Sequence, residues 1–358
     1  MKIFNTFVKV IMMKVSVIGA GPSGCIAAAS ALEEGYNATI YEEHKEIGLP
    51  EQCGGLLSKS AIEWFSDKGI NYKKTIKNKI FGAELHSGKT KILIKDRTPK
   101  AFVVKRSSFD LACANFAEHK GAEIKLNHKL TSNQISQLSK SSFIIGADGP
   151  HSTVAKTFRF PEIKHYAIAY QKDITNLNLN KQEKHLAQVY LHEKAFGWLI
   201  PLSEERAHVG MIFFQNPEVR KFDWFLEEIC SKIDKNKLKT ENFFADIVPF
   251  SIRPKIQKKN VYLVGDAAGQ VKATSGGGIY YGCRSAWLAG KTIGSGAYEK
   301  RWKSELGNKL EQHLLARKVI NTLNGNVTSR LLSILEGFGI EHMLRRYDME
   351  NISSLVRL

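Results

Sequence analysis

The sequence has few cysteines, and none of them lie close together in the sequence. Its five cysteines, in 358 residues, are an odd number, and none of them has C-x-x-C spacing. This pattern excludes a disulfide framework and a zinc site of the usual spacing, and it favours a reducing compartment. A chain of this length can instead bury one large hydrophobic core or two linked ones.

Long hydrophobic runs are also missing. No segment approaches the roughly 20 apolar residues of a membrane-spanning helix. The mildly apolar stretch 1–11 is interrupted by Lys9 and is followed by no cleavage site, so a signal peptide is not expected. Met12 or Met13 is an alternative start. We expect a cytoplasmic protein and leave open a peripheral contact with the inner face of the cell membrane.

Acidic residues are in deficit. Asp and Glu total 35 against 52 Lys and Arg, for a formal net charge of +17. Such an excess favours anionic partners, among them acidic lipid headgroups, phosphorylated substrates and acidic donor proteins. The basic residues are dispersed and no nucleic-acid motif is found, so no nucleic-acid partner is expected. A lysine-rich genomic composition would explain the excess equally well.

Three short glycine-containing motifs stand far apart, at 17–24, 146–149 and 264–269. The first follows a β-branched apolar run typical of a buried parallel strand. In it, Gly19 permits a tight turn and Gly21 lets the backbone approach a pyrophosphate. Gly24 allows a helix to pack closely on the strand. The N–H groups of that helix would face the phosphates.

An acidic residue follows the next strand at the expected place. The strand 38–41 ends at Glu42, 18 residues beyond Gly24, where a carboxylate can accept hydrogen bonds from ribose hydroxyls. Glu43 is the alternative if the register slips by one residue. A βαβ unit that binds no nucleotide is the other interpretation, and Glu42 counts against it.

The third motif supplies another carboxylate. Asp266 follows an apolar strand, so its side chain can accept a hydrogen bond from a ribityl hydroxyl. The run 274–279 then opens a helix whose free N–H groups can stabilise negative charge on a reduced flavin. A plain glycine-rich loop is the simpler interpretation of that run. Taken in order, the three motifs match different parts of one FAD.

The spacing of the motifs predicts an α/β fold whose FAD-binding domain is discontinuous. We expect a Rossmann-like ββα domain, a second domain built on an antiparallel sheet, and a helical C-terminus. The hairpin 81–94 belongs to the second sheet. The expected boundaries are 13–75, 100–160 and 255–300 for the FAD domain, 76–99 and 161–254 for the substrate-binding sheet, and 301–358 for the helical region.

Further segments make the chain resemble the geranylgeranyl reductases, and especially the archaeal-type digeranylgeranylglycerophospholipid reductases. These belong to the p-hydroxybenzoate-hydroxylase-like flavoprotein superfamily. The resemblance covers about 13–290. It is carried by the three motifs, the third of which extends over Gly265–Gly282, and by three other segments: Glu46–Gly55, Val104–Asp110 and Gly197–Pro201. The Cys-Gly-Gly element at 53–55 and the run 276–279 are the parts more particular to the reductases.

The resemblance implies a set of contacts with FAD. Ser23 and Gly24 should contact the pyrophosphate, Glu42 the ribose, and the backbone of Leu130 the adenine. The ribityl and isoalloxazine parts should be surrounded by Arg106, Asp266, Gly278 and Ile279. The expected cofactor-binding set is therefore Gly19, Gly21, Ser23, Gly24, Glu42, Cys53, Gly54, Arg106, Leu130, Asp148, Asp266, Gly278 and Ile279.

The family implies saturation of isoprenoid double bonds in membrane lipid precursors. Reduced flavin would give hydride to one alkene carbon while an acid protonates the other, in a dry apolar pocket. The candidate acids are Cys53, Tyr280 and Tyr281, and the sequence does not choose among them. Cys53 could equally be a buried structural thiol. The substrate would be an isoprenoid lipid or geranylgeranyl diphosphate, and the electron donor ferredoxin or NAD(P)H.

The chain departs from the family in an aromatic motif. The family has Tyr-x-Trp-x-Phe-Pro where this chain has 196–201, so Phe196 lacks a hydroxyl. Trp198 could line the apolar channel or simply belong to the core. Three rival functions remain: a flavin monooxygenase of the same superfamily, a flavin halogenase, and an isoprenoid-binding carrier without FAD. No Trp-x-Trp-x-x-Ile motif supports a halogenase, and the intact glycine motif, Glu42 and Asp266 count against a carrier.

Overall fold

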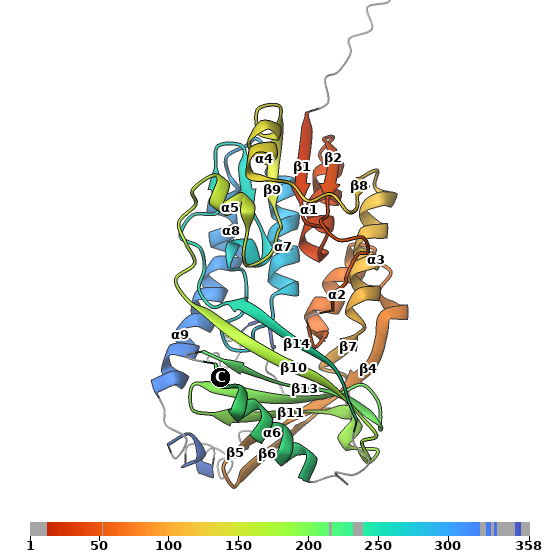
Figure 1. The fold of residues 1–358 in the computed structure, drawn as a ribbon, viewed down its shortest axis with the longest axis vertical. Coiled ribbons are helices and arrows are strands. Elements are labelled where there is room, and N and C mark those ends of the chain that lie inside the picture. The colour runs from red at the N-terminus through yellow and green to blue at the C-terminus, as the bar shows by residue number, and fades with distance from the viewer. Residues whose placement is uncertain are drawn as a thin grey trace, which may run out of the picture.

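Three sheets and the helices around them make up the fold (Figure 1). The computed structural model describes residues 13–51, 53–214, 217–231, 239–322, 327–330, 333–334 and 348–351. Met12, one of the two alternative starts, therefore lies outside the described residues. No helix in the described ranges is long and apolar enough to cross a membrane.

The first sheet has six strands in the order β15-β16-β9-β1-β2-β8. Every neighbouring pair is parallel except β15 and β16. The apolar runs predicted as strands are buried here, with Val17, Ile40 and Ile144 fully enclosed. The strands are β1 (Lys14–Ile18), β2 (Asn37–Tyr41), β8 (Glu123–Lys125), β9 (Ser142–Gly146), β15 (Gln257–Lys258) and β16 (Val261–Leu263).

Helix α1 (Pro22–Glu33) packs on this sheet and between α3 (Arg106–His119) and α7 (Ile279–Lys291). The small side chains along α1, such as those of Ala27 and Ala28, are fully buried and allow close packing on both sides. The other helices around this part are α2 (Lys59–Asp67), α4 (Ser132–Leu138), α5 (Thr153–Thr157), α8 (Tyr298–Trp302) and α9 (Asn308–Thr322).

The second sheet has seven strands in the order β14-β10-β13-β12-β11-β5-β6. Its neighbours are antiparallel except β11 and β5, which pair in parallel. The hairpin β5–β6 thus joins this sheet, as the sequence predicts. The strands are β5 (Gly82–Ser87), β6 (Thr90–Lys95), β10 (Tyr166–Thr175), β11 (Leu186–His192), β12 (Ala195–Pro201), β13 (Arg206–Phe213) and β14 (Lys239–Pro249).

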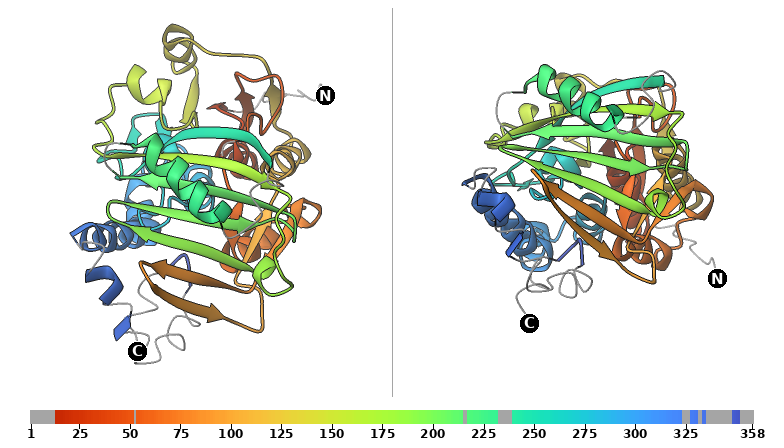
Figure 2. Two further views of the ribbon diagram at one scale, coloured as in Figure 1. Left: turned by 60° about the horizontal axis from the view of Figure 1, so that its bottom comes forward. Right: turned by 90° about the horizontal axis from the view of Figure 1, so that it is seen from below.

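Helix α6 (Val219–Ser231) covers one face of the second sheet (Figure 2). Its residues Phe222, Phe225, Leu226 and Ile229 are buried against that face. On the opposite face, Phe196, Ile212 and Phe250 form an apolar cluster with Ala273, which belongs to the segment before α7. This face of the second sheet, which carries Phe196, Ile212 and Trp198 and is called its inner face below, therefore packs against the segment that precedes α7.

A third sheet has three strands, β3 (Leu56–Ser58), β7 (Ala101–Val104) and β4 (Ile76–Ile80), with β7 in the middle. Segment 76–80 therefore pairs with β7 and not with the seven-stranded sheet. The predicted helical region is α-helical over α8 and α9, apart from a π-helical turn at Lys303–Gly307. Most of 323–358 lies outside the described residues.

Candidate functional site

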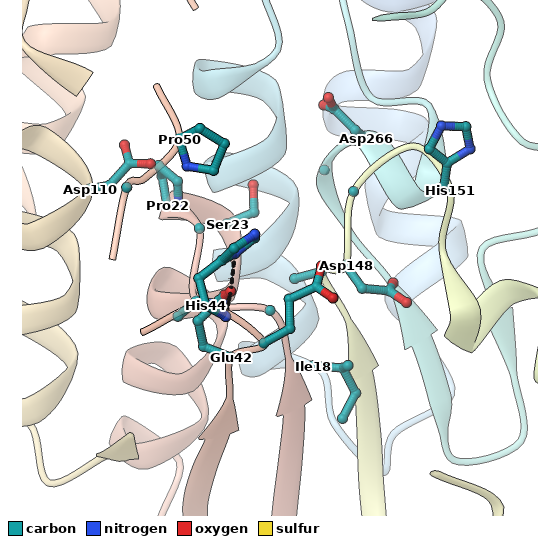
Figure 3. A pocket seen from close by; sticks show the side chains of 18 of the residues that line it. Ile18, Pro22, Ser23, Glu42, His44, Pro50, Asp110, Asp148, His151 and Asp266 are labelled. Atoms are coloured by element: carbon teal, nitrogen blue, oxygen red, sulfur yellow. Dashed lines mark hydrogen bonds and ion pairs between the residues drawn. The ribbon is translucent and has the colours of Figure 1, made fainter. Parts of the chain in front are cut away.

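A cleft of about 550 Å³ opens at the carboxyl ends of β1, β2 and β9 (Figure 3). Open parallel sheets bind ligands at this edge, because the loops that leave the strands converge there. The cleft brings together most of the predicted cofactor-binding residues. Those that line it are Gly19, Gly21, Ser23, Glu42, Cys53, Arg106, Leu130, Asp148, Asp266, Gly278 and Ile279.

The first glycine motif forms the floor of the cleft. Gly19 has φ +100°, and a Cβ there would lie 2.4 Å from the carbonyl oxygen of Ala147. Gly24 does not line the cleft. A Cβ on it would lie 1.9 Å from the carbonyl oxygen of Gly19, so it sets the close packing of α1 on β1. At Gly21, by contrast, a Cβ would meet no protein atom within 4 Å, and the backbone is open to a ligand.

Glu42 is the acidic residue that turns inward. It is 9% exposed, and its carboxylate accepts hydrogen bonds from the N–H of Ala20 (2.7 Å) and the N–H of His44 (2.9 Å). His44 Nδ1 lies 2.6 Å from the same carboxylate (Figure 3). The alternative, Glu43, forms an exposed ion pair with Lys129 at the rim, and a hydrogen bond from Lys129 lowers the pKa of Glu43.

The two aspartates of the later motifs have different surroundings. Asp148 accepts hydrogen bonds from Ser152 Oγ (2.7 Å) and the N–H of Val154 (2.9 Å), so it holds the start of α5. The Asp266 backbone carbonyl accepts a hydrogen bond from the N–H of Gly269 (3.0 Å), but its side-chain carboxylate has no hydrogen bond or ion pair with another of the described residues. Burial, and then the Asp246 carboxylate, raise the pKa of Asp266 to about 6. Asp266 is therefore a free acceptor at the cleft.

Arg106, the first residue of α3, lies between Cys53 and Asp110. Its guanidinium donates two hydrogen bonds of 2.9 Å to the Asp110 carboxylate, and the Cys53 sulfur is near enough for its charge to act on the guanidinium. Burial lowers the pKa of Arg106, but the Asp110 carboxylate and the Cys53 sulfur raise it by more, so it ends well above its ordinary value. Arg106 is therefore a fixed positive charge beside the Cys53 sulfur.

The glycine-rich turn before α7 forms another wall. Gly276, Gly278 and Ile279 line the cleft, and α7 begins at Ile279. The two candidate acids that follow do not line it. Tyr280 is half-buried and its hydroxyl lies 2.9 Å from Arg284 Nη1. Tyr281 is fully buried and its hydroxyl donates to the carbonyl of Glu350. Of the three candidate acids, only Cys53 reaches the cleft.

Trp198 and Phe196 lie on the inner face of the second sheet and not at the cleft itself. The indole N–H of Trp198 donates to Gln171 Oε1 over 3.3 Å. Gly54 abuts this pair, since a Cβ on it would lie 3.1 Å from Gln171 Oε1 and 3.9 Å from Trp198 Nε1. The Cys-Gly-Gly element therefore connects the cleft to the aromatic face of the second sheet.

Several residues that line the cleft were not predicted as site residues from the sequence. Asp110 could be found, since an acidic residue four positions after Arg106 on one helix is a standard pairing distance. His44, His151 and Asp246 also line the cleft, but no motif marks them. In the view of Figure 3, His151 and Asp266 are drawn on the opposite side of the cleft from Pro50 and Asp110. Gln171, which contacts Trp198 and is not among the residues lining the cleft, carries no local signal either, because that partner is 27 residues away.

These residues fit FAD. The open backbone at Gly21 and the first turn of α1 suit a pyrophosphate. The buried carboxylate of Glu42 suits a ribose, and the free Asp266 carboxylate suits the hydroxyls of a ribityl chain. Among the described residues no group of three or more His, Cys, Asp or Glu side chains could hold a metal ion. The backbone N–H groups and carboxylates at the cleft are those expected of a dinucleotide site.

Comparison with known proteins agrees with this geometry. The profile of the family described as "FAD binding domain" matches residues 12–297. An uncharacterized protein of Methanocaldococcus jannaschii is 29% identical, over 95% of this chain and 93% of its own length. Digeranylgeranylglycerophospholipid reductase 1 of Methanosphaera stadtmanae is 26% identical, over 93% and 90%.

Among solved structures, a geranylgeranyl bacteriochlorophyll reductase-like protein from Thermoplasma acidophilum superposes with a TM-score of 0.79. The superposition covers 97% of this chain and 96% of that one, at 20% sequence identity. At this identity the superposition bears on the fold, and it agrees with the predicted α/β fold with an added antiparallel sheet.

Proposed function

This chain belongs to the FAD binding domain family, and on that premise we propose that it is a flavin-dependent reductase of isoprenoid double bonds in membrane lipid precursors. One observation carries the proposal: the Cys-Gly-Gly element joins the FAD cleft to the aromatic inner face of the second sheet at Gly54. An apolar chain lying along Phe196 and Trp198 would therefore meet the cleft beside Cys53. The similarity to lipid reductases supports the same activity.

The chemistry assigns separate tasks to the chain's own residues. When bound and reduced, FAD supplies a hydride to one alkene carbon. An isolated alkene has no carbonyl to take up charge, so the protein must deliver a proton to the other carbon. Cys53 is the donor in this proposal. Its sulfur is left as a thiolate that the Arg106 guanidinium stabilises, and water returns the proton afterwards.

The inner face of the second sheet holds the substrate in this proposal. Phe196, Trp198 and Ile212 are apolar neighbours there, and an apolar wall keeps water from the reacting carbons. Phe196 offers no hydroxyl, so the chain of the substrate is held by contact area and not by a hydrogen bond at this position.

The partners follow from charge and chemistry. The substrate is an isoprenoid lipid or geranylgeranyl diphosphate, and the electrons come from ferredoxin or NAD(P)H. The excess of 52 basic over 35 acidic residues suits both an acidic donor protein and anionic headgroups. We propose that the enzyme works in the cytoplasm and that its basic surface allows a peripheral contact with the inner face of the membrane.

The test is anaerobic incubation of the chemically reduced holoenzyme with geranylgeranyl lipids, followed by mass spectrometry. Gain of hydrogen pairs is the expected result. Products with an added oxygen, formed in air at the expense of NAD(P)H, would instead identify a monooxygenase. A purified protein that is colourless and does not take up FAD would identify a carrier and contradict the proposal.

The role of Cys53 is tested by Cys53→Ala. We expect kcat to fall about 10²- to 10⁴-fold, the usual contribution of a positioned acid, while FAD affinity falls much less, because only one of the many contacts with the cofactor is lost. Cys113→Ala is the matched control, because Cys113 is a buried cysteine of α3 that is not among the residues lining the cleft. Equal rates in the two variants would remove Cys53 from the reaction.

A further inference from the structure

A buried ion pair lies behind the glycine-rich turn that precedes α7. Lys272 Nζ is 2.8 Å from Glu350 Oε1, and each side chain is 5% exposed. The same ammonium also donates to the carbonyl of Met349 over 3.2 Å. Residues 348–351 thus bring a carboxylate to the turn from 78 positions along the chain. Removing either charged group would leave the other without its partner in a nearly water-free place.

The ion pair is separated from the cleft by only one layer of backbone. A Cβ on Gly277 would lie 3.0 Å from Lys272 Cε and 3.5 Å from its Nζ. The neighbours of Gly277, Gly276 and Gly278, line the cleft. Charge on Lys272 or Glu350 therefore acts on the cleft through protein of low dielectric constant, where screening by solvent is weak.

A second cation supports the turn from the same side. Arg317 of α9 donates to the carbonyl oxygens of Ala273 (3.0 Å) and Thr274, and its guanidinium lies 4.2 Å from the ring centre of Phe214. Burial lowers the pKa of Arg317 to about 10, so it stays charged at neutral pH. Its partners are carbonyl oxygens, and no carboxylate among the described residues pairs with it.

The neighbouring histidine adds no charge. His313 of α9 is fully buried, and its Nδ1 lies 2.7 Å from Thr274 Oγ1. Burial, and then Lys272, lower the pKa of His313 to about 4, so the ring is neutral at pH 7. Lys272, Arg317 and Glu350 are therefore the charged groups in contact with the turn, and the Asp348 carboxylate, two positions before Glu350, accepts a hydrogen bond from the N–H of Glu350.

We propose that Lys272, Arg317 and Glu350, the rear cluster, set the reduction potential of bound FAD. Lys272 and Arg317 favour the negative charge that the flavin ring gains on reduction, and Glu350 opposes it. The N-terminus of α7 acts in the same direction as the two cations. The proposal rests on the expected placement of the isoalloxazine ring beside Gly278 and Ile279. The three residues act through space and touch neither cofactor nor substrate.

The test is the midpoint potential of holoenzyme variants, measured by anaerobic titration against redox dyes without any lipid. Glu350→Gln leaves Lys272 unpaired, so the potential should become more positive. Adding Lys272→Met to that variant removes the freed cation, and the potential should return toward the wild-type value. Glu305→Gln is the control, because it removes an exposed carboxylate paired with Arg301, and it should shift nothing.

Arg317 provides an independent arm if the ion-pair variants lose FAD. Arg317→Met should move the potential to more negative values, whereas Arg317→Lys keeps the charge and should leave it near that of the wild type. Circular dichroism and an FAD titration of each variant report its folding and cofactor affinity. If the three residues served only to hold the fold, all the variants would bind FAD more weakly, and their midpoint potentials would not follow the charge that each variant removes.

The outcomes separate this proposal from the proposed function. Potentials that follow the charge, in a protein that reduces no alkene, would uphold the rear cluster and contradict the reductase. If the variants reduce alkenes but have the same midpoint potential as the wild type, the reductase function would be upheld and the role of the rear cluster contradicted. Loss of FAD from the Glu350, Lys272 and Arg317 variants alike would overturn the tuning role, since it would assign these residues to folding.

Discussion

At the scale of single residues, the two later glycines of the first motif have separable tasks. In Gly21→Ala the new methyl group meets no protein atom within 4 Å, and φ is already −64°, so the apoprotein should lose no more than about 1 kcal/mol of stability. The methyl group would stand where the pyrophosphate approaches, so FAD affinity should fall strongly. Thermal unfolding of the apoprotein and an FAD titration measure the two effects.

Gly24→Ala is the matched comparison. Its methyl group would lie 1.9 Å from the carbonyl oxygen of Gly19, so α1 must move away from β1 and both stability and FAD affinity should fall. If Gly21→Ala destabilised the apoprotein as much as Gly24→Ala, the open backbone at Gly21 would not be the phosphate site.

Asp266 predicts a dependence of stability on pH. Burial, and then Asp246, raise its pKa from 3.8 to about 6. A carboxyl group whose pKa is higher in the folded state stabilises the fold while protonated. That contribution is complete below about pH 4 and is lost as the pH rises through 6. Asp266→Asn should therefore stabilise the apoprotein at pH 8 by up to about 3 kcal/mol and leave it unchanged at pH 4.

The same variant should bind FAD less tightly, by about tenfold, because an amide accepts hydrogen bonds from hydroxyls more weakly than a carboxylate. Urea unfolding of the apoprotein across this pH range, with Asp67→Asn as an exposed control, measures the first effect. An equal gain in stability at pH 4 and pH 8 would contradict the assigned titration.

The tyrosines show where residue-level prediction stops. Sequence proximity places Tyr280 and Tyr281 next to Ile279, which lines the cleft. Successive helical residues, however, are rotated by about 100°, so the next two side chains turn away from it. Only the start of α7, observed at Ile279, fixes which side chain faces the cleft. For Glu42 the reverse holds, because the strand before it sets its direction and the spacing from Gly24 was sufficient.

At the scale of elements, α6 should matter for stability and not for the cofactor. Phe225 is fully buried between α6 and the second sheet, with edge-to-face contacts to Tyr190 and His192. Phe225→Ala should cost about 3–5 kcal/mol of unfolding free energy, as large-to-small changes in a core do. FAD affinity at a temperature where the variant is folded should stay the same, because α6 lies on the face of the sheet away from Ala273.

Urea unfolding followed by circular dichroism gives the stability, and a titration of apoprotein with FAD gives the affinity. Leu226→Ala, a change on the same helix, is the companion variant and should act in the same way. A weakened FAD affinity in both variants would mean that α6 also shapes the cleft.

Strands and helices could be predicted from the sequence where an apolar run or alternation ends at a turn-forming residue such as glycine. The run before Gly19 became β1, and the hairpin around Gly88 became β5 and β6. Pairing partners were less accessible. Strand β4 joins β7 and not the hairpin that follows it, and β11 pairs in parallel with β5 from a distant part of the chain. Such pairings depend on how whole sheets stack, which no local pattern encodes.

The same limit explains why the rear cluster could not be predicted. Lys272 stands in a glycine-rich segment that the motifs mark, but Glu350 lies in a stretch with no motif, 78 residues away. Lys and Glu are mostly exposed in folded proteins, so composition gives no reason to bury either one. Their pairing follows from the return of residues 348–351 to the turn, which is a property of the tertiary fold.

At the scale of the whole molecule, the two large sheets are interleaved along the chain. The six-stranded sheet takes strands from before β5 and from after β14, and the seven-stranded sheet takes its hairpin from between β4 and β7. Neither sheet can therefore unfold without displacing segments of the other. We expect one cooperative unfolding transition, and saturation with FAD should raise its midpoint for both sheets alike.

Tryptophan positions allow that expectation to be checked. Trp64, Trp287 and Trp302 pack in the core around the first sheet, whereas Trp198 and Trp224 belong to the second sheet and α6. Variants that keep the tryptophans of only one group, with the others changed to Phe, report each part separately during urea unfolding. Coincident midpoints, shifted together by FAD, are expected because FAD binds where segments from all along the chain converge. A second-sheet transition that FAD does not move would show that the two sheets unfold as separate units.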